Sequence, residues 1–374
     1  MAVKAMTDHT KGLVVDADLH GHENIAELAE FCEIPWSVAL RHMGDSPDRN
    51  IAISPRPTFT APFPGGLARA KQTPSALQML SEMDTLGIDI GILFPDHLLS
   101  IPVIERPDFA TAVAAAYNDW LLSKWLSASS RLRGAIVVAP QEPREAAAEI
   151  RREAANSEFV AICLATCGVR PLYGHKSYDP VYEAACDTGL PVVLHGLTTV
   201  HPTFPFQLDV FQSEFMKHAF AHSLSIMANV GSIIETGVPE RFPELRIGLL
   251  EAGVTWIAFA MKRFDREYLE RRRQVPHLKR LPSAYLADMY VGTQPLDLDR
   301  PGALDGLTAV CGHELRLIFA SDWPHHDFDH PDVIRRLAGS AASRQRILYE
   351  NAYGLFRALP KGVLMPSRAD SRAI

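Results

Sequence analysis

Eight short apolar segments alternate with segments of helical periodicity along this chain, and this alternation restricts its possible folds more than any other feature. The apolar segments lie at 13–18, 88–95, 132–140, 159–165, 190–196, 245–253, 288–295 and 315–322. Continuous apolar strands joined by helices predict parallel pairing, with both faces of the sheet covered. Eight such units predict an α/β fold of the closed (β/α)8 TIM-barrel type. An open doubly wound sheet is the alternative, but no G-x-G-x-x-G follows an early strand to favour a dinucleotide-binding version.

The barrel is expected to form one domain over residues 12–360. The segment 23–72 is too long for a single connection after the first strand, and its run SPRPTFTAPFPGG is rich in Pro and Gly. We therefore expect 23–72 to be an insertion that forms a lid over the barrel mouth. In the next helix, Thr73 is the expected N-cap and Gly87 the expected terminator. Residues 361–374 are expected to form a disordered tail.

The composition excludes several classes of protein. The 374 residues are 47% hydrophobic and 22% charged, as in ordinary soluble domains, and the net charge of −7 argues against nucleic acid or an anionic membrane as partner. No apolar run is long enough to span a membrane, and the first residues lack the apolar core of a signal peptide. Five scattered cysteines fit reduced thiols. We expect a cytoplasmic protein that acts on a small molecule.

Acidic and imidazole side chains follow five of the apolar segments directly. They are Asp18 and His20, Asp96 and His97, His195, Glu251, and Asp322 with His325. In a (β/α)8 barrel the active site lies at the carboxyl ends of the strands, and residues two apart on a strand point to the same side. Buried carboxylates and imidazoles are costly unless a cation lies between them. Nitrogen and oxygen ligands of this kind suit zinc, manganese, iron or cobalt, so the pattern predicts a divalent-metal site.

Several of these residues also have a purely structural interpretation. Glu251 precedes a helix, where a carboxylate can cap the first turn. Asp322 can cap a turn, and His222, in the run HAFAHSLS, is either a ligand, an acid–base group or an ordinary helix residue. Supporting roles are expected for Asp16, His22 and His97.

Five segments between Val14 and Phe328 carry a resemblance to a known family. They are VVDADLH, LPVVLHG, ERFPELRIGLLEAGVTWIAFAMKRFDREY, RLPSAYLADMYVGTQP and IFASDWPHHDFD. Together they resemble the amidohydrolase-related family of metal-dependent hydrolases and decarboxylases. The resemblance implies a (β/α)8 barrel with metal ligands at the ends of strands 1, 5 and 8, here Asp18, His20, His195 and Asp322. If the motif of strand 1 is instead aligned two residues later, the ligand pair would be His20 and His22. The resemblance also implies a homo-oligomer, or a hetero-oligomer with a homologous subunit.

One departure from the family pattern shapes the functional prediction. Family decarboxylases place an acid–base histidine at the end of strand 6, where this chain has Glu251. We therefore expect a metal-dependent hydrolase of a small organic molecule, with zinc and a metal-activated water. The expected catalytic residues are Asp322, Glu251 and His222, and the expected metal ligands are Asp18, His20, His195, Glu251, Asp322, His222 and His325.

Three alternatives stay open on the same fold. A carboxylate-rich site would suit a dinuclear iron or manganese oxygenase, or a subunit of one. A non-oxidative decarboxylase of an aromatic acid is the next alternative. A non-enzymatic subunit that keeps a vestigial metal site, paired with a catalytic homologue, is the last.

Overall fold

Eight parallel strands pair in chain order in the computed structural model of this protein, which describes residues 12–44, 75–166, 168–197, 208, 211–325, 327–356 and 359. The strands are β1 (Val15–Gly21), β2 (Ile90–Pro95), β3 (Leu132–Val137), β4 (Phe159–Ala165), β5 (Val192–His195), β6 (Ile247–Leu250), β7 (Tyr290–Gly292) and β8 (Arg316–Ile318). Every neighbouring pair from β1–β2 to β7–β8 is parallel.

Backbone hydrogen bonds between β1 and the segment after β8 close the sheet into a barrel. The Ala17 amide donates to the Phe319 carbonyl at 2.9 Å, and the Asp322 amide donates to the Asp18 carbonyl at 3.0 Å. Leu19 and Trp323 also form a parallel bridge. The predicted (β/α)8 barrel is therefore confirmed, and its closure brings the carboxyl end of the first strand beside that of the last.

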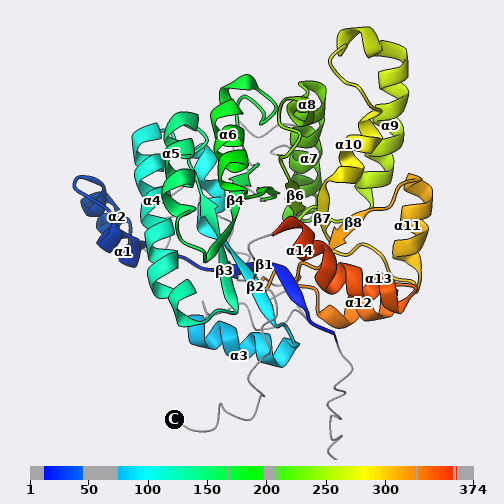
Figure 1. Ribbon diagram of the computed structural model, residues 1–374. Coiled ribbons are helices and arrows are strands. Elements are labelled where there is room, and N and C mark those ends of the chain that lie inside the picture. Colours follow the sequence, from blue (N-terminus) through cyan, green and yellow to red (C-terminus); the bar gives the residue numbers. More distant parts are fainter. Residues whose placement is uncertain are drawn as a thin grey trace, which may run out of the picture.

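Helices surround the strands, as Figure 1 shows, with α1 and α2 beside α4 at the side of the barrel. The α-helices are α1 (Ile25–Leu28), α2 (Trp36–Gly44), α3 (Ala76–Leu86), α4 (Pro107–Lys124), α5 (Pro143–Glu153), α6 (Asp179–Thr188), α7 (Glu214–Glu235), α8 (Val238–Arg241), α9 (Trp256–Arg271), α10 (Pro282–Asp288), α11 (Ala303–Cys311), α12 (Pro331–Leu337), α13 (Ala341–Gln345) and α14 (Asn351–Leu355). Short 3₁₀ or π turns are η1 (Ala29–Phe31), η2 (His97–Val103), η3 (Leu126–Ala128), η4 (Lys176–Tyr178), η6 (Arg272–Gln274) and η7 (Arg346–Glu350).

The start of α3 differs from the prediction. Ser75, not Thr73, is the N-cap: its side chain accepts from the Gln78 amide while the Gln78 side chain accepts from the Ser75 amide. This reciprocal pair satisfies two amides that a helix start leaves unpaired. Gly87 ends the helix in the left-handed conformation, at φ 74°, as predicted.

The predicted insertion 23–72 is described only in part. Its described part, residues 23–44, contains α1, η1 and α2, and α1 and α2 contact α4. Residues 45–74 and the predicted tail at 361–374 lie outside the described residues. The lid therefore stays a prediction.

β1 differs from an ordinary barrel strand in what it buries. All seven of its residues are buried, including Asp16, Asp18 and His20, whereas β2 and β4 bury only apolar or small side chains apart from a cysteine. Among these three strands, buried acidic and imidazole side chains occur only in β1, one of the two strands at the barrel closure. Among the described residues, no helix combines the length and apolar character needed to cross a membrane.

Candidate metal centre

Asp18 and His20 project from the carboxyl end of β1 and are completely buried. His20 Nδ1 lies 2.8 Å from the carbonyl oxygen of Pro95 on β2. Because a carbonyl oxygen only accepts, Nδ1 donates the proton, and Nε2 is the ring atom that can coordinate an ion. His20 Nε2 faces Oδ1 of Asp18 at 3.5 Å, so both residues direct donor atoms to the same point.

His195, the last residue of β5, approaches that point from across the barrel. Its Nδ1 lies 2.9 Å from the carbonyl oxygen of Gly196, which sets the tautomer in the same way as for His20. Its Nε2 lies 3.1 Å from Oδ1 of Asp18. Two imidazole nitrogens therefore converge on one carboxylate.

Asp322 completes the group from the segment after β8. Its Oδ1 lies 3.0 Å from His20 Nε2 and 2.7 Å from His325 Nδ1. Its Oδ2 accepts a hydrogen bond from Gln294 Nε2 at 3.1 Å. Sequence reasoning missed Gln294, which follows β7; a polar residue after a barrel strand was the available signal.

Glu251 follows β6 and lies between two histidines. Its Oε2 is 3.3 Å from His195 Nδ1, and its Oε1 is 3.3 Å from Nε2 of His222 on α7. Gly196 permits this approach, because a Cβ there would lie 2.8 Å from the Glu251 carbonyl oxygen. The sixth-strand carboxylate thus connects the centre to α7.

Glu251 and Asp322 also share an unusual backbone conformation. Their φ angles are 56° and 63°, and they are the only non-glycine residues with positive φ within the described part of the chain. Such conformations cost about 1–3 kcal/mol each and persist where the surrounding structure imposes them, often at functional sites.

We call Asp18, His20, His195 and Asp322 the central cluster. Donor atoms of Asp18, His20 and His195 lie within 4.8 Å of one another, as do those of His20, Asp322 and His325. Asp18 Oδ2 and His20 Nε2 are buried without a hydrogen-bond partner among the described residues. Facing lone pairs on His20 and Asp322 repel unless a proton or cation lies between them. The residues present therefore fit a divalent metal with mixed nitrogen and oxygen ligands.

Burial and neighbouring charges move the pKa values in this region in opposite directions. Burial, reinforced by the charge of Asp322, raises the pKa of Glu251 to about 8. Burial also acts to raise the pKa of Asp322, but the imidazoles of His325 and His20 hold it below its usual range. Burial lowers the pKa of His222 to about 3, so its imidazole is neutral near pH 7.

All seven predicted ligand residues lie in this region of the barrel. The central cluster brings four of them together, Glu251 contacts His195 and His222, and His325 stacks on His20 with ring centroids 4.3 Å apart. His22, the alternative ligand from strand 1, instead contacts Asp96. The ligand roles themselves remain predictions.

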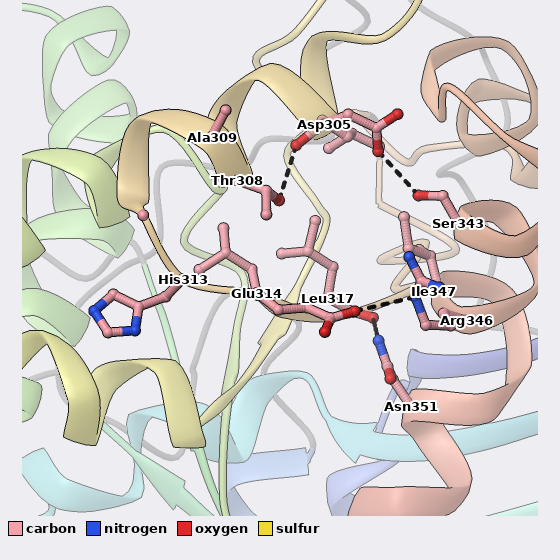
Figure 2. Close-up of a pocket in the computed structure, with 13 residues that line it drawn as sticks. Asp305, Thr308, Ala309, His313, Glu314, Leu317, Ser343, Arg346, Ile347 and Asn351 are labelled. Atoms are coloured by element: carbon pink, nitrogen blue, oxygen red, sulfur yellow. Dashed lines mark hydrogen bonds and ion pairs between the residues drawn. The ribbon is translucent and has the colours of Figure 1, made fainter.

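A pocket of about 430 Å³ lies elsewhere, between α11, the start of β8 and the segment from α13 to α14, and none of the predicted site residues lines it (Figure 2). Its polar groups pair with one another: Ser343 Oγ donates to Asp305 at 3.2 Å, and Arg346 lies 3.5 Å from Glu314. It adjoins the amino end of β8, whereas barrel active sites lie at the carboxyl ends.

The fold and the central cluster define a (β/α)8 barrel protein with a candidate divalent-metal site at the carboxyl ends of its strands. The chain belongs to the amidohydrolase family, because the sequence model described as Amidohydrolase matches residues 41–358. This match confirms the resemblance found in the sequence, although it begins after β1 and so does not include Asp18 and His20.

Three similar proteins illustrate the relationship. A γ-resorcylate decarboxylase from Polaromonas sp. strain JS666 is 23% identical over 293 residues, which cover 74% of this chain and 85% of the relative. The structure of a 5-carboxyvanillate decarboxylase from Sphingomonas paucimobilis matches with a TM-score of 0.69 and 22% identity, covering 92% of this chain and 99% of the other. A dihydroxybenzoic acid decarboxylase from Polaromonas sp. JS666, with bound manganese and the inhibitor 2-nitroresorcinol, matches with a TM-score of 0.65 and 19% identity, covering 93% and 97%.

These comparisons contradict the predicted hydrolase. The names of all three proteins state decarboxylation, and none states hydrolysis or oxygenation. The prediction was wrong because it took the missing strand-6 histidine as evidence against decarboxylation, although a carboxylic acid can also hold and donate a proton. The expected zinc and iron find no support either, since the metal bound in the third protein is manganese.

Proposed function

We propose that this protein is a manganese-dependent, non-oxidative decarboxylase of a small aromatic acid with a hydroxyl group beside its carboxylate. The observation that carries the proposal is the buried, convergent donor set of the central cluster, on a fold shared over 92% of the chain with a decarboxylase of such an acid. The substrates in the relatives' names, γ-resorcylate, 5-carboxyvanillate and dihydroxybenzoic acid, are all aromatic acids.

The central cluster would hold the ion through Asp18, His20, His195 and Asp322. When bound, a divalent ion supplies positive charge that orients the anionic oxygens of the substrate. The hydrogen bond from Gln294 and the contact with His325 fix the Asp322 carboxylate, and the Pro95 and Gly196 carbonyls fix the two imidazoles. Ligand orientation is therefore set before substrate binds.

Decarboxylation requires one proton at the ring carbon. The bond between that carbon and the carboxylate breaks, its electron pair stays on the carbon, and CO₂ leaves. We assign proton delivery to Glu251 in its protonated form, because its carboxyl group reaches the central cluster through His195. His222, 3.3 Å from Glu251 Oε1, is placed to return the proton after each turnover.

The experiment is a decarboxylation assay on the manganese-loaded protein. The protein is incubated without oxygen with 2,6-dihydroxybenzoate or 5-carboxyvanillate, and CO₂ release and substrate absorbance are followed. We expect one CO₂ per substrate consumed, independence of oxygen, and loss of turnover in Glu251→Gln while metal content is retained. Absence of CO₂ release across a panel of ortho-hydroxy aromatic acids, with the metal bound, would contradict the proposal.

A further inference from the structure

A second group of metal-binding side chains lies at the carboxyl ends of β1 and β2. It consists of His22, Asp96 and His97, each of which offers a donor atom within 4.8 Å of those of the other two. We propose that this group, the rim cluster, binds a second divalent transition-metal ion, separate from the ion of the central cluster. The proposal does not depend on which reaction the central cluster supports.

The pairing of β1 with β2 brings the rim cluster together. Gly21 pairs with Pro95 at the end of the two strands, so the residues that follow, His22 and Asp96, are neighbours. The buried carboxylate of Glu23 accepts hydrogen bonds from the backbone amides of 96, 97 and 98, at 3.1, 2.9 and 3.2 Å. The donors are therefore held on a fixed backbone rather than on a free loop.

The donors of the rim cluster surround a buried carboxylate. The Asp96 side chain is only 4% exposed, its Oδ2 contacts His22 Nδ1 directly, and His97 Nε2 lies 3.9 Å from the same oxygen. His97 Nδ1 is buried and has no hydrogen-bond partner in the described part of the chain. A cation among these atoms would compensate the buried charge and use the imidazole lone pairs.

The donor set indicates the class of ion. Two imidazoles and one carboxylate form a three-ligand set with an open position, which suits zinc or cobalt better than magnesium or calcium. The side chains of His22 and His97 are 20% and 34% exposed, so an ion can enter from solvent. The central cluster, by contrast, is closed to solvent at all four ligands.

His325 links the two clusters. Its Nδ1 lies 2.7 Å from Asp322 Oδ1, and its Nε2 lies 3.4 Å from Asp96 Oδ1. Its Nε2 can therefore complete the rim cluster as a further donor while Nδ1 stays on Asp322. Asp322, a central ligand, would then be oriented by a histidine that a rim ion holds.

The test counts metal ions in the full-length protein. Metal-free protein is dialysed against zinc, and bound zinc is measured by elemental analysis; cobalt is used in parallel, because its visible absorption reports imidazole coordination. The variants are the double substitution His22→Ala with His97→Ala, and His195→Ala in the central cluster. His277→Ala, an exposed histidine between α9 and α10, is the matched control.

We expect two zinc ions per chain in the unaltered protein and in the control, and one in each of the other two variants. The double variant should lose the rim-cluster ion and keep the central-cluster ion, and His195→Ala should lose the central-cluster ion and keep the rim-cluster ion. If the double variant fails to fold, His97→Ala alone should weaken the second zinc by about 100-fold or more, since even outer partners of a ligand contribute about 10–100-fold. A single bound zinc ion in the unaltered protein would overturn the proposal. So would two bound zinc ions in a folded double variant, or an unchanged affinity for the second zinc ion in His97→Ala.

Discussion

Polar side chains are paired at the amino end of β8 but are partly unpaired at its carboxyl end. At its amino end, the pocket of Figure 2 pairs its polar groups with one another, and no residue lining it carries a buried unpaired side-chain atom in the described part of the chain. At its carboxyl end, which lies beside that of β1, Asp18 Oδ2 and His20 Nε2 of β1 are buried without a hydrogen-bond partner among the described residues, and Asp322 adopts a positive φ. Polar groups that satisfy one another stabilise the fold, whereas the unsatisfied donor atoms that converge in the central cluster fit a bound cation.

The largest effect should come from removing a central ligand. His195→Ala should weaken metal binding by more than about 100-fold and abolish turnover, because it deletes a donor whose Nε2 faces Asp18 at 3.1 Å. Metal content by elemental analysis and folding by circular dichroism check this together. Full metal content in a folded His195→Ala protein would contradict a ligand role for His195, and the two ends of β8 would then not differ in metal binding.

The hydrogen bond from Gln294 to Asp322 should have the next largest effect. Gln294→Ala removes the donor to Asp322 Oδ2 and should reduce metal affinity by about 10–100-fold, with the fold intact. Competition with a chelator of known affinity measures the change. An unaltered affinity would show that Asp322 does not need this partner, and Gln294→Glu provides a charge-changed comparison.

Removing one central carboxylate should have a larger effect with metal than without. Asp18→Asn should destabilise the manganese-loaded protein by at least about 1–2 kcal/mol more than the metal-free protein, because it removes a donor atom for the ion. Urea denaturation with chelator and with manganese measures both free energies of unfolding. Equal destabilisation under the two conditions would contradict this interpretation.

The smallest effect is expected at the amino end. Glu314 and Arg346 are 76% and 45% exposed, so Glu314→Gln should change the free energy of unfolding by less than about 1 kcal/mol. Metal content and turnover should not change. A loss of metal content or of turnover in Glu314→Gln would indicate that the pocket of Figure 2 contributes to function, which its paired contacts do not indicate.

Much of the fold and the composition of the central cluster could be predicted from sequence. An apolar run that ends in Asp18, His195 or Asp322 identifies a strand and the residue at its carboxyl end, and barrel closure then brings these ends together. The contact of Gln294 with Asp322 and the contacts of His22 with Asp96 depend on strand register and on loop conformation, which no periodic pattern specifies.

The reaction was harder to predict than the metal site. The prediction of the reaction rested on one residue, Glu251. Burial and the charge of Asp322 raise the pKa of Glu251 to about 8, and the residue type alone does not reveal this shift. The start of α3 was predicted at Thr73 because Pro74 is typical of the first helical position. The S-x-x-Q pattern that begins at Ser75 forms the capping box instead.

The most direct test of the metal centre is a crystal structure of manganese-loaded protein with anomalous data collected near the manganese absorption edge. We predict an anomalous peak within bonding distance of Asp18, His20, His195 and Asp322. Full manganese loading with no peak among these four side chains would contradict it.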